Sequence, residues 1–358
     1  MPSDHAHPLR VGLIGYGLAG RVFHAPLIAA TPDLRLSAVV TRDPERRAML
    51  QAEHPGAAAL DSPDQLWARV PDLDLDVVVV ATPNRTHVPL ARAALQAGLP
   101  VVVDKPLAPA SADARALAAE ARARGLLLTV FQNRRWDGDF LTVQRLLGEG
   151  AMGEVRRFES RFERWVPVRK GSWRERGEPE EAGGLLFDLG AHLIDQASLL
   201  FGRAIAVYAE LDRRRPGAEV DDDAFVALTH ASGVRSHLWM SKVAAQRGPR
   251  FRVLGERAAF TKFGLDVQEP DLAAGGVPGT PGWGEEPPEL WGRLGVDDAT
   301  REVRSEAGCY QRFYGGLAAA LRGAGPTPVD PEDAIATLEI IEAARSSAEA
   351  GVVKRLGT

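Results

Sequence analysis

Residues 10–131 alternate between short apolar runs and stretches with helical periodicity, and this alternation constrains the fold more than any other feature. Helical patterns such as Thr86–Ala97 and Ser111–Arg124 separate the runs. Apolar runs without polar alternation indicate strands buried on both faces, as in a parallel sheet covered by helices. The N-terminal part is therefore predicted to be a doubly wound α/β domain. The apolar runs are Leu9–Ile14, Leu34–Val40, Val77–Ala81, Val101–Val103 and Leu126–Phe131.

The pattern changes after Asn133, where longer strands of mixed alternation are joined by turns that contain glycine or proline. This pattern is typical of a meandering, mostly antiparallel sheet in an α+β domain. Helices are predicted at Leu185–Phe201 and at residues 331–350. The Pro- and Gly-rich residues 270–300 predict a long surface excursion. The predicted strands are Glu154–Trp165, Ala204–Arg215, Ala224–Val243 and Arg250–Phe263.

Length, charge and composition restrict the class of protein. The 358 residues are enough for two domains, which we place at residues 8–134 and 135–358. A formal net charge of −5 predicts no nucleic-acid partner. No apolar run approaches the roughly 18 residues of a membrane span, and Met1–Arg10 lacks the features of a signal peptide. Cys309 is the only cysteine, which fits a cytoplasmic protein.

A G-x-G-x-x-G loop follows the first predicted strand and precedes a helical run. Its glycines are Gly15, Gly17 and Gly20, and Leu18 and Ala19 lie between the last two. Such glycines permit a tight turn, close backbone approach to a pyrophosphate and close packing of helix on strand. A glycine-rich turn without a ligand is the alternative interpretation. The context favours a Rossmann domain that binds NAD or NADP through these five residues.

The residues after the second predicted strand indicate which cofactor is bound. About 20 residues beyond the glycine loop, NAD enzymes place a carboxylate on the ribose hydroxyls. This chain has Thr41 and Arg42 there, with Asp43 further on. Arg42 can pair with a 2′-phosphate, so we favour NADP over NAD. NAD stays possible if Asp43 reaches the ribose and Arg42 is only a solvated loop arginine.

The loop after the central strand adds Ala81, Thr82, Pro83 and Asn84 to the predicted cofactor site. These residues follow a parallel strand at its carboxyl end, where such sheets bind ligands. His87, just beyond, is a further candidate for cofactor contact, with helix capping or packing as its alternative role.

Lys105 stands at the end of the predicted strand Val101–Val103, between Asp104 and Pro106. Lysine is scarce in this chain, which has 5 lysines and 38 arginines. A lysine at the tip of an apolar strand therefore suggests a need for a compact ammonium group. We predict that Lys105 polarises the reacting oxygen of a substrate beside the cofactor.

The predicted helix Leu185–Phe201 carries Asp188, His192 and Asp195 at spacings i, i+4 and i+7, on one helical face. An Asp one turn from a His can fix the imidazole tautomer and raise its basicity, which suits a base for a hydroxyl proton. Two carboxylates and a His are also ligand-like for a metal. Because no further His or Cys cluster is evident, we expect no metal site.

Two clusters are candidate substrate contacts. Arg135 and Trp136 follow the last predicted strand of the first domain and could form a polar and stacking wall for a polyol, or a salt-bridged hinge. Arg174, beside Trp173, could lie over the pocket. Asp195 completes the predicted set of substrate-binding residues.

Together these segments resemble the Gfo/Idh/MocA family, named for glucose–fructose oxidoreductase, inositol dehydrogenase and rhizopine catabolism. The resemblance runs from Arg10 to about Gly351. It is strongest to a bacterial subgroup that contains an NADP-dependent scyllo-inositol dehydrogenase. The motifs that carry it are Gly15–Gly20, Ala81–Asn84, Asp104-Lys105-Pro106 and Asp188-x-x-x-His192-x-x-Asp195.

The resemblance implies a Rossmann domain followed by a domain with an open, largely antiparallel sheet. It also implies a catalytic set of Lys105, Asp188 and His192, and a cis bond between Lys105 and Pro106. The family usually has Glu where this chain has Asp104, whose carboxylate reaches one methylene less far toward the cofactor or Lys105. Asp104 and Lys105 are also expected to contact the cofactor. The family's open sheet commonly makes oligomer contacts, so we expect a homo-oligomer, either a dimer or a tetramer.

We therefore expect an NADP(H)-dependent dehydrogenase that transfers a hydride between the nicotinamide and a secondary alcohol or ketone of a cyclic polyol or sugar. In this hypothesis His192 exchanges the proton, Lys105 stabilises the alkoxide, and Asp188 orients His192 or binds a neighbouring hydroxyl. A sugar or anhydrosugar reductase and a non-catalytic NAD(P)-sensing regulator are the alternatives.

Overall fold

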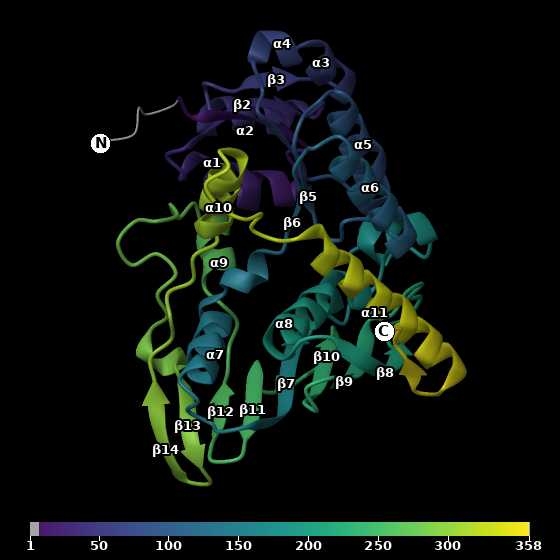
Figure 1. The fold of residues 1–358 in the computed structure, drawn as a ribbon, viewed down its shortest axis with the longest axis vertical. Helices are drawn as coiled ribbons and strands as arrows, with labels where there is room; N and C mark the ends of the chain where they lie inside the picture. Colours follow the sequence, from purple (N-terminus) through teal and green to yellow (C-terminus); the bar gives the residue numbers. More distant parts are fainter. Residues whose placement is uncertain (1–6, 358) are drawn as a thin grey trace.

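The computed structural model describes residues 7–357, which form two domains, each built on its own sheet (Figure 1). The first sheet has six parallel strands in the order β3-β2-β1-β4-β5-β6. The strand order reverses between β1 and β4, and sheets of this kind bind ligands at such a point. The strands are β1 Leu9–Ile14, β2 Leu34–Val40, β3 Ala58–Leu60, β4 Val77–Val80, β5 Val101–Asp104 and β6 Leu128–Phe131.

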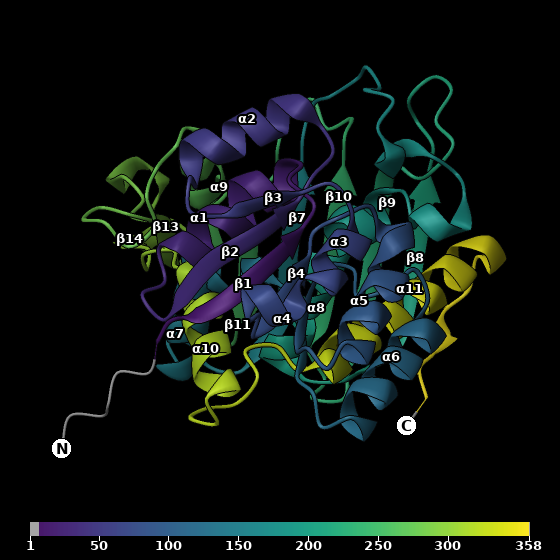
Figure 2. The same cartoon turned by 90° about the horizontal axis from the view of Figure 1, so that it is seen from above.

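Helices cover the first sheet, so its central strand β4 has no exposed side chain. Figure 2 looks onto this domain from above, with α2 along its rim. Asp43 begins α2 by accepting hydrogen bonds from the backbone amides of Glu45 and Arg46, and Pro44 occupies the first helical position. The helices are the π-helical η1 Ala19–His24, α1 Ala25–Ala29, α2 Pro44–Glu53, α3 Pro63–Ala68, α4 Val70–Leu73, α5 His87–Gln96 and α6 Ser111–Ala123.

The second sheet has nine strands in the order β14-β13-β12-β11-β7-β10-β9-β8-β15. All neighbours are antiparallel except β7 and β10, which run parallel. The predicted fold class, a Rossmann sheet followed by a mostly antiparallel sheet, is confirmed. The strands are β7 Val155–Glu163, β8 Ala204–Asp212, β9 Asp223–His230, β10 Arg235–Ser241, β11 Phe251–Gly255, β12 Ala259–Lys262, β13 Gly292–Val296, β14 Ala299–Val303 and β15 Lys354–Arg355.

The prediction of a surface excursion at residues 270–300 is correct for residues 274–291, which form no strand and are mostly exposed, and wrong for the two ends of the stretch. This stretch completes α9 (Gln268–Ala273), contains β13 and begins β14, and these two strands extend the sheet beyond β12. Its glycines concealed the strands because Gly292 and Gly295 lie within β13, where a Cβ would collide with the ring of Phe260 or the backbone of Ala299.

One face of the second sheet is covered by α7 (Gly138–Gly148), α8 (Ala191–Phe201) and α11 (Pro331–Ala350), whereas α10 (Gln311–Leu321) packs against α1. Strand β9 shows the resulting asymmetry, because its side chains alternate between buried and partly exposed along its whole length. The uncovered face carries an aromatic cluster of Phe225, His237 and Trp239.

Helix α11 contacts both domains (Figure 1). Its C-terminal half packs along β8, and it also lies against α6 and β6 of the first domain. Glu342 of α11 accepts hydrogen bonds from the backbone amide and the hydroxyl of Ser111, both at 2.7 Å. The helix matches its predicted bounds.

Within residues 7–357, no helix is long and apolar enough to span a membrane. Residues 1–6, which form most of the segment judged to lack a signal peptide, and Thr358 lie outside the described residues.

Candidate active site

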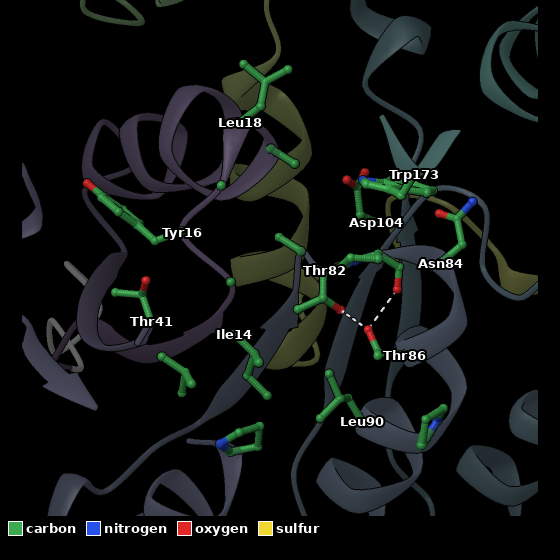
Figure 3. Close-up of a pocket in the computed structure, with 18 of the residues that line it drawn as sticks. Ile14, Tyr16, Leu18, Thr41, Thr82, Asn84, Thr86, Leu90, Asp104 and Trp173 are labelled. Carbon is green, nitrogen blue, oxygen red and sulfur yellow. Dashed lines mark hydrogen bonds between the residues drawn. The ribbon is translucent and has the colours of Figure 1, made fainter. Parts of the chain in front are cut away.

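A cavity of about 900 Å³ lies between the two domains, at the carboxyl ends of the parallel strands (Figure 3). The first domain contributes the loops after β1, β2, β4 and β5, and Figure 3 shows Tyr16 and Thr41 on one side and Asp104 on the other. Of the predicted cofactor-binding residues, all except Gly20 and His87 line the cavity. The second domain contributes Trp173, Arg174, Ala182, Phe187 and Asp188.

The glycine loop is shaped by backbone contacts. Gly15 has a φ of 101°, and a Cβ there would collide with the carbonyl oxygen of Ala81. Gly20 is buried beneath the loop, where a Cβ would meet the carbonyl oxygen of Gly15. Gly17 instead faces open space, and the nearest atom to its Cβ position is Nη1 of Arg46 at 3.8 Å. This space at the start of the following helix fits the pyrophosphate of a dinucleotide.

The loop after β2 presents cations to the cavity. Arg42 and Arg46 both line it, while the carboxylate of Asp43 is used as the N-cap of α2. Asp61, which also lines the cavity, forms an ion pair of 2.6 Å with Arg47. Asp43 and Asp61 are thus engaged within the protein. Asp64 also lines this end of the cavity, and neither Asp64 nor Arg42 forms an ion pair among the described residues.

The loop after β4 is fixed by its own side chains. The hydroxyls of Thr82 and Thr86 are hydrogen-bonded at 2.7 Å, as Figure 3 shows. Asn84 donates to the carbonyl oxygen of Glu181 at 2.9 Å, which ties the loop to the second domain. His87 does not face the cavity. It is buried, with its ring nitrogens 2.7 and 2.9 Å from the carbonyl oxygens of Pro106 and Thr82, so it packs between two loops.

Lys105 brings the first domain into contact with the second. The Lys105–Pro106 bond is cis, which confirms that prediction. The Lys105 ammonium donates to a carboxylate oxygen of Asp188 at 3.0 Å and also to the Asp188 carbonyl oxygen. Burial raises the pKa of the Asp188 carboxyl, but the positive charges of Lys105 and Arg174 outweigh it and hold the pKa below its ordinary value. Asp188 is therefore a carboxylate at neutral pH.

His192 is buried one turn beyond Asp188, and its partner is not the predicted one. Its Nδ1 lies 3.1 Å from the side-chain oxygen of Gln132, at the end of β6, whereas Asp188 bonds Lys105. An amide oxygen accepts only, so Nδ1 carries the proton and Nε2 is left as the basic atom. Burial, together with the charges of Lys105 and Arg134, lowers the pKa of His192 well below its ordinary value.

Comparison with known proteins assigns the chain to a family. A family model described as an oxidoreductase family with an NAD-binding Rossmann fold matches residues 9–132. A second model, described as the C-terminal alpha/beta domain of the oxidoreductase family, matches residues 144–355. The chain belongs to the Gfo/Idh/MocA oxidoreductase family.

Relatives within this family align over nearly the whole chain. The uncharacterized oxidoreductase YdgJ of Escherichia coli strain K12 is 40% identical over 351 residues, which cover 95% of this chain and 96% of YdgJ. The NADP⁺-dependent scyllo-inositol 2-dehydrogenase IolW of Bacillus subtilis strain 168 is 33% identical over 345 residues, or 95% and 94% of the two chains. The solved structure of the yvaA protein from Bacillus subtilis superposes with a TM-score of 0.92 at 32% identity, covering 98% of this chain and 99% of that one.

Three residues of this chain that were predicted to bind substrate do not line the cavity, namely Arg135, Trp136 and Asp195. Arg135 forms hydrogen bonds of 2.8 and 2.6 Å with Asp195 and one of 2.9 Å with Asp333 at the start of α11. Trp136 packs edge-on against Phe313, with ring centroids 5.8 Å apart. These contacts match the alternative interpretation, a salt-bridged hinge, and a role of the partly buried Arg135 and Trp136 in substrate binding stays a prediction.

The shared helical face of Asp188, His192 and Asp195 is also not formed as predicted. Residues Leu186–Gly190 are π-helical, and α8 begins only at Ala191. A π-turn holds more residues than an α-turn, so the spacing rule for an α-helix does not carry across it. Asp188 consequently turns to Lys105 and Asp195 to Arg135, while His192 contacts Gln132.

Two residues of the site were not found from the sequence. Gln132 carried no signal beyond its place at the end of the last strand of the first sheet. Arg46 lies in the first turn of α2, and its sequence position did not distinguish it from a solvent-exposed helix arginine, whereas in the structure it lines the cavity. Among residues 7–357, no group of three or more His, Cys, Asp or Glu is arranged to hold a metal ion.

Proposed function

We propose that the protein is an NADP(H)-dependent dehydrogenase of secondary alcohols on a cyclic polyol or sugar. The observation that carries this proposal is the contact between Lys105 and Asp188 across the domain boundary, at the cavity and next to His192. A protein that only senses the cofactor does not require the ammonium of Lys105, the carboxylate of Asp188 and the imidazole of His192 to lie close together.

Each residue has a distinct part in the proposed reaction. When bound, the nicotinamide accepts the hydride from the substrate carbon or returns it. The Nε2 atom of His192 takes the hydroxyl proton during oxidation and gives it back during reduction. The Lys105 ammonium stabilises the alkoxide that forms as the proton leaves, and Asp188 holds that ammonium in place. Because the pKa of His192 is lowered, its ring is neutral and able to accept a proton at neutral pH.

The cations near β2 support NADP as the cofactor. A 2′-phosphate placed there meets Arg42 and Arg46, while Asp43 is engaged as a helix cap and does not compete for the ribose. The relative IolW, which is NADP⁺-dependent by name, agrees with this choice.

A screen of polyols and sugars with NADP⁺ and with NAD⁺, followed by nicotinamide absorbance, tests the proposal. We expect turnover of at least one cyclic polyol or sugar, a preference for NADP⁺, and a loss of turnover of about 10²- to 10⁴-fold in His192→Asn. Tight NADPH binding without turnover of any alcohol or ketone would instead support a sensor.

A further inference from the structure

Arg174 presents unused hydrogen-bond donors to the substrate end of the cavity. Its guanidinium lies over the indole ring of Trp173, 4.5 Å from the ring centroid. Its closest carboxylate is that of Asp188, at 3.4 Å from Nε, and that carboxylate already accepts from Lys105. Among residues 7–357, the guanidinium of Arg174 makes no hydrogen bond. A planar fork of free donors in a pocket is suited to a carboxylate or a phosphate.

Two further cations lie at the ends of neighbouring strands. Arg164 follows β7 and Lys242 follows β10, and the Arg164 amide donates to the carbonyl oxygen of Ser241 at 2.8 Å. Side chains alternate along strands, so Arg164 continues the row of Phe162, and Lys242 that of Met240. Phe162 and Met240 are fully buried beneath the helices. Both cations therefore point to the helix-covered face, on the side that carries the catalytic groups.

Neither of these cations has a strong partner. Arg164 forms no ion pair within the described part of the chain, although it is only partly exposed. Lys242 lies 3.7 Å from a carboxylate oxygen of Glu175, and Arg215 already binds the same oxygen at 2.9 Å. Half-buried cations without hydrogen-bonded partners are unfavourable unless a ligand supplies the missing charge.

Contacts place Lys242 near the turn that carries Asp188 and near Glu175, the residue after Arg174, while the charge of Arg164 acts on the neighbouring Glu269. Strand β10 packs against the π-helical turn that carries Asp188. Burial raises the pKa of Asp188, and positive charges that include those of Arg174 and Lys242 lower it. Burial likewise raises the pKa of Glu269, and the charges of Arg134 and Arg164 hold it below its ordinary value.

Positive charge remains around Asp188 and Glu269 after the close pairs are formed, with Arg174 at the cavity wall and Arg164 and Lys242 behind it. Lys105 pairs with Asp188, and Arg134 pairs with Glu269. Arg174 and Lys242 keep only longer contacts, of 3.4 and 3.7 Å, with carboxylates that already bind another cation, and Arg164 forms no ion pair within residues 7–357. We propose that these three cations bind an anionic substituent, a carboxylate or a phosphate, on the polyol or sugar substrate. This inference rests on the proposed dehydrogenase function, and the anion fixes the substrate without taking part in hydride or proton transfer.

Matched substrates that differ only in the anion test the inference: D-glucose against D-glucuronate and D-glucose 6-phosphate, and myo-inositol against myo-inositol 1-phosphate. With NADP⁺, we expect kcat/KM to be at least about tenfold higher for an anionic compound than for its neutral partner. Its KM should rise with ionic strength, because salt screens the attraction. The carboxylate and phosphate arms identify which anion is preferred. Equal kcat/KM for anionic and neutral partners would overturn the inference and leave the dehydrogenase function standing.

Single variants Arg164→Met, Arg174→Met and Lys242→Met should each lower the anionic-to-neutral ratio of kcat/KM about tenfold or more. Arg176→Met, an exposed arginine on the same segment as Arg174, is the matched control and should keep the ratio. If no compound turns over, binding of the same compounds to the NADPH complex is measured by tryptophan fluorescence. Anion binding that weakens in the three variants supports the site even when the dehydrogenase function fails, and binding that does not change in them refutes it.

Discussion

The two halves of the cleft are built in different ways. In the cofactor half, the shape comes from backbone, since Gly15 and Gly20 lie where carbonyl oxygens leave no room for a side chain. In the substrate half, the arrangement comes from side chains of different elements, as Lys105 meets Asp188 and His192 meets Gln132. The cofactor half is therefore sensitive to added atoms, and the substrate half is sensitive to lost functional groups.

The largest effect is expected in the substrate half. Lys105→Met keeps the length of the side chain and removes the charge that stabilises the alkoxide, so we expect kcat to fall by about 10²- to 10³-fold. NADPH affinity, measured by fluorescence titration, should change little. Lys170→Met, at an exposed lysine, serves as the control. A nearly normal kcat in Lys105→Met would remove the ammonium from the mechanism.

The next largest effect is expected in the cofactor half, where one added carbon atom should weaken NADPH binding. Gly15→Ala forces a φ near 101° on an L-residue and pushes a methyl group against the Ala81 carbonyl. We expect NADPH affinity to fall by about tenfold or more, which corresponds to at least about 1.4 kcal/mol. Gly56→Ala, with no atom within 4 Å of the Cβ position, should bind NADPH normally. If the two variants bind equally well, backbone crowding does not shape this half.

A smaller effect on kcat is expected from Gln132, the residue that positions the ring of His192. Gln132→Leu removes the acceptor for Nδ1 of His192, and we expect kcat to fall by about tenfold because the ring loses its preferred tautomer.

The companion variant Gln132→Glu shows the direction of the pH effect. Oxidation needs neutral His192, so turnover falls at pH values below the His192 pKa. A carboxylate beside Nδ1 favours the imidazolium and raises this pKa, so the acid limb of the pH–kcat profile should move to higher pH. A purely structural defect would lower kcat without moving the limb, and that result would contradict the positioning role.

A similar or smaller effect concerns the choice of cofactor. Arg42→Ala and Arg46→Ala should each reduce kcat/KM for NADP⁺ by about tenfold and change that for NAD⁺ little, because only NADP⁺ carries the 2′-phosphate. Arg35→Ala, on an exposed position of β2, is the control. An equal loss with both cofactors would mean that these arginines do not distinguish them.

Substitutions on the open face of the second sheet should affect the cleft least. We propose that this face is the contact surface of a homo-oligomer. Trp239 lies there beside Phe225, with the guanidinium of Arg161 3.9 Å from its ring centroid. Trp239→Glu should lower the molar mass found by light scattering and leave NADPH affinity unchanged. A wild-type protein that is already a monomer would refute this proposal.

The sequence predicted those parts of the molecule that depend on local pattern. The strands of the Rossmann sheet and α11 follow from apolar runs, proline and glycine, although β3 was missed because Ala58–Leu60 is short and alanine-rich. The side-chain pairs could not be predicted in the same way. With 38 arginines in the chain, spacing does not reveal that Arg135 forms hydrogen bonds with Asp195, whereas Arg174 lies 3.4 Å from Asp188 without a hydrogen bond. The π-turn at Leu186–Gly190 adds a shift that α-helical periodicity cannot anticipate.

Helix α11 has a consequence for how the cleft can open. It is bonded to the first domain through Glu342 and Ser111, packs along β8 of the second, and meets the Arg135–Asp195 pair through Asp333 near its N-terminus. A sliding motion between the domains would break all of these contacts together. A hinge rotation of one domain relative to the other about the axis of α11 breaks few of them. We therefore expect the cleft to open by such a rotation when cofactor and substrate are exchanged.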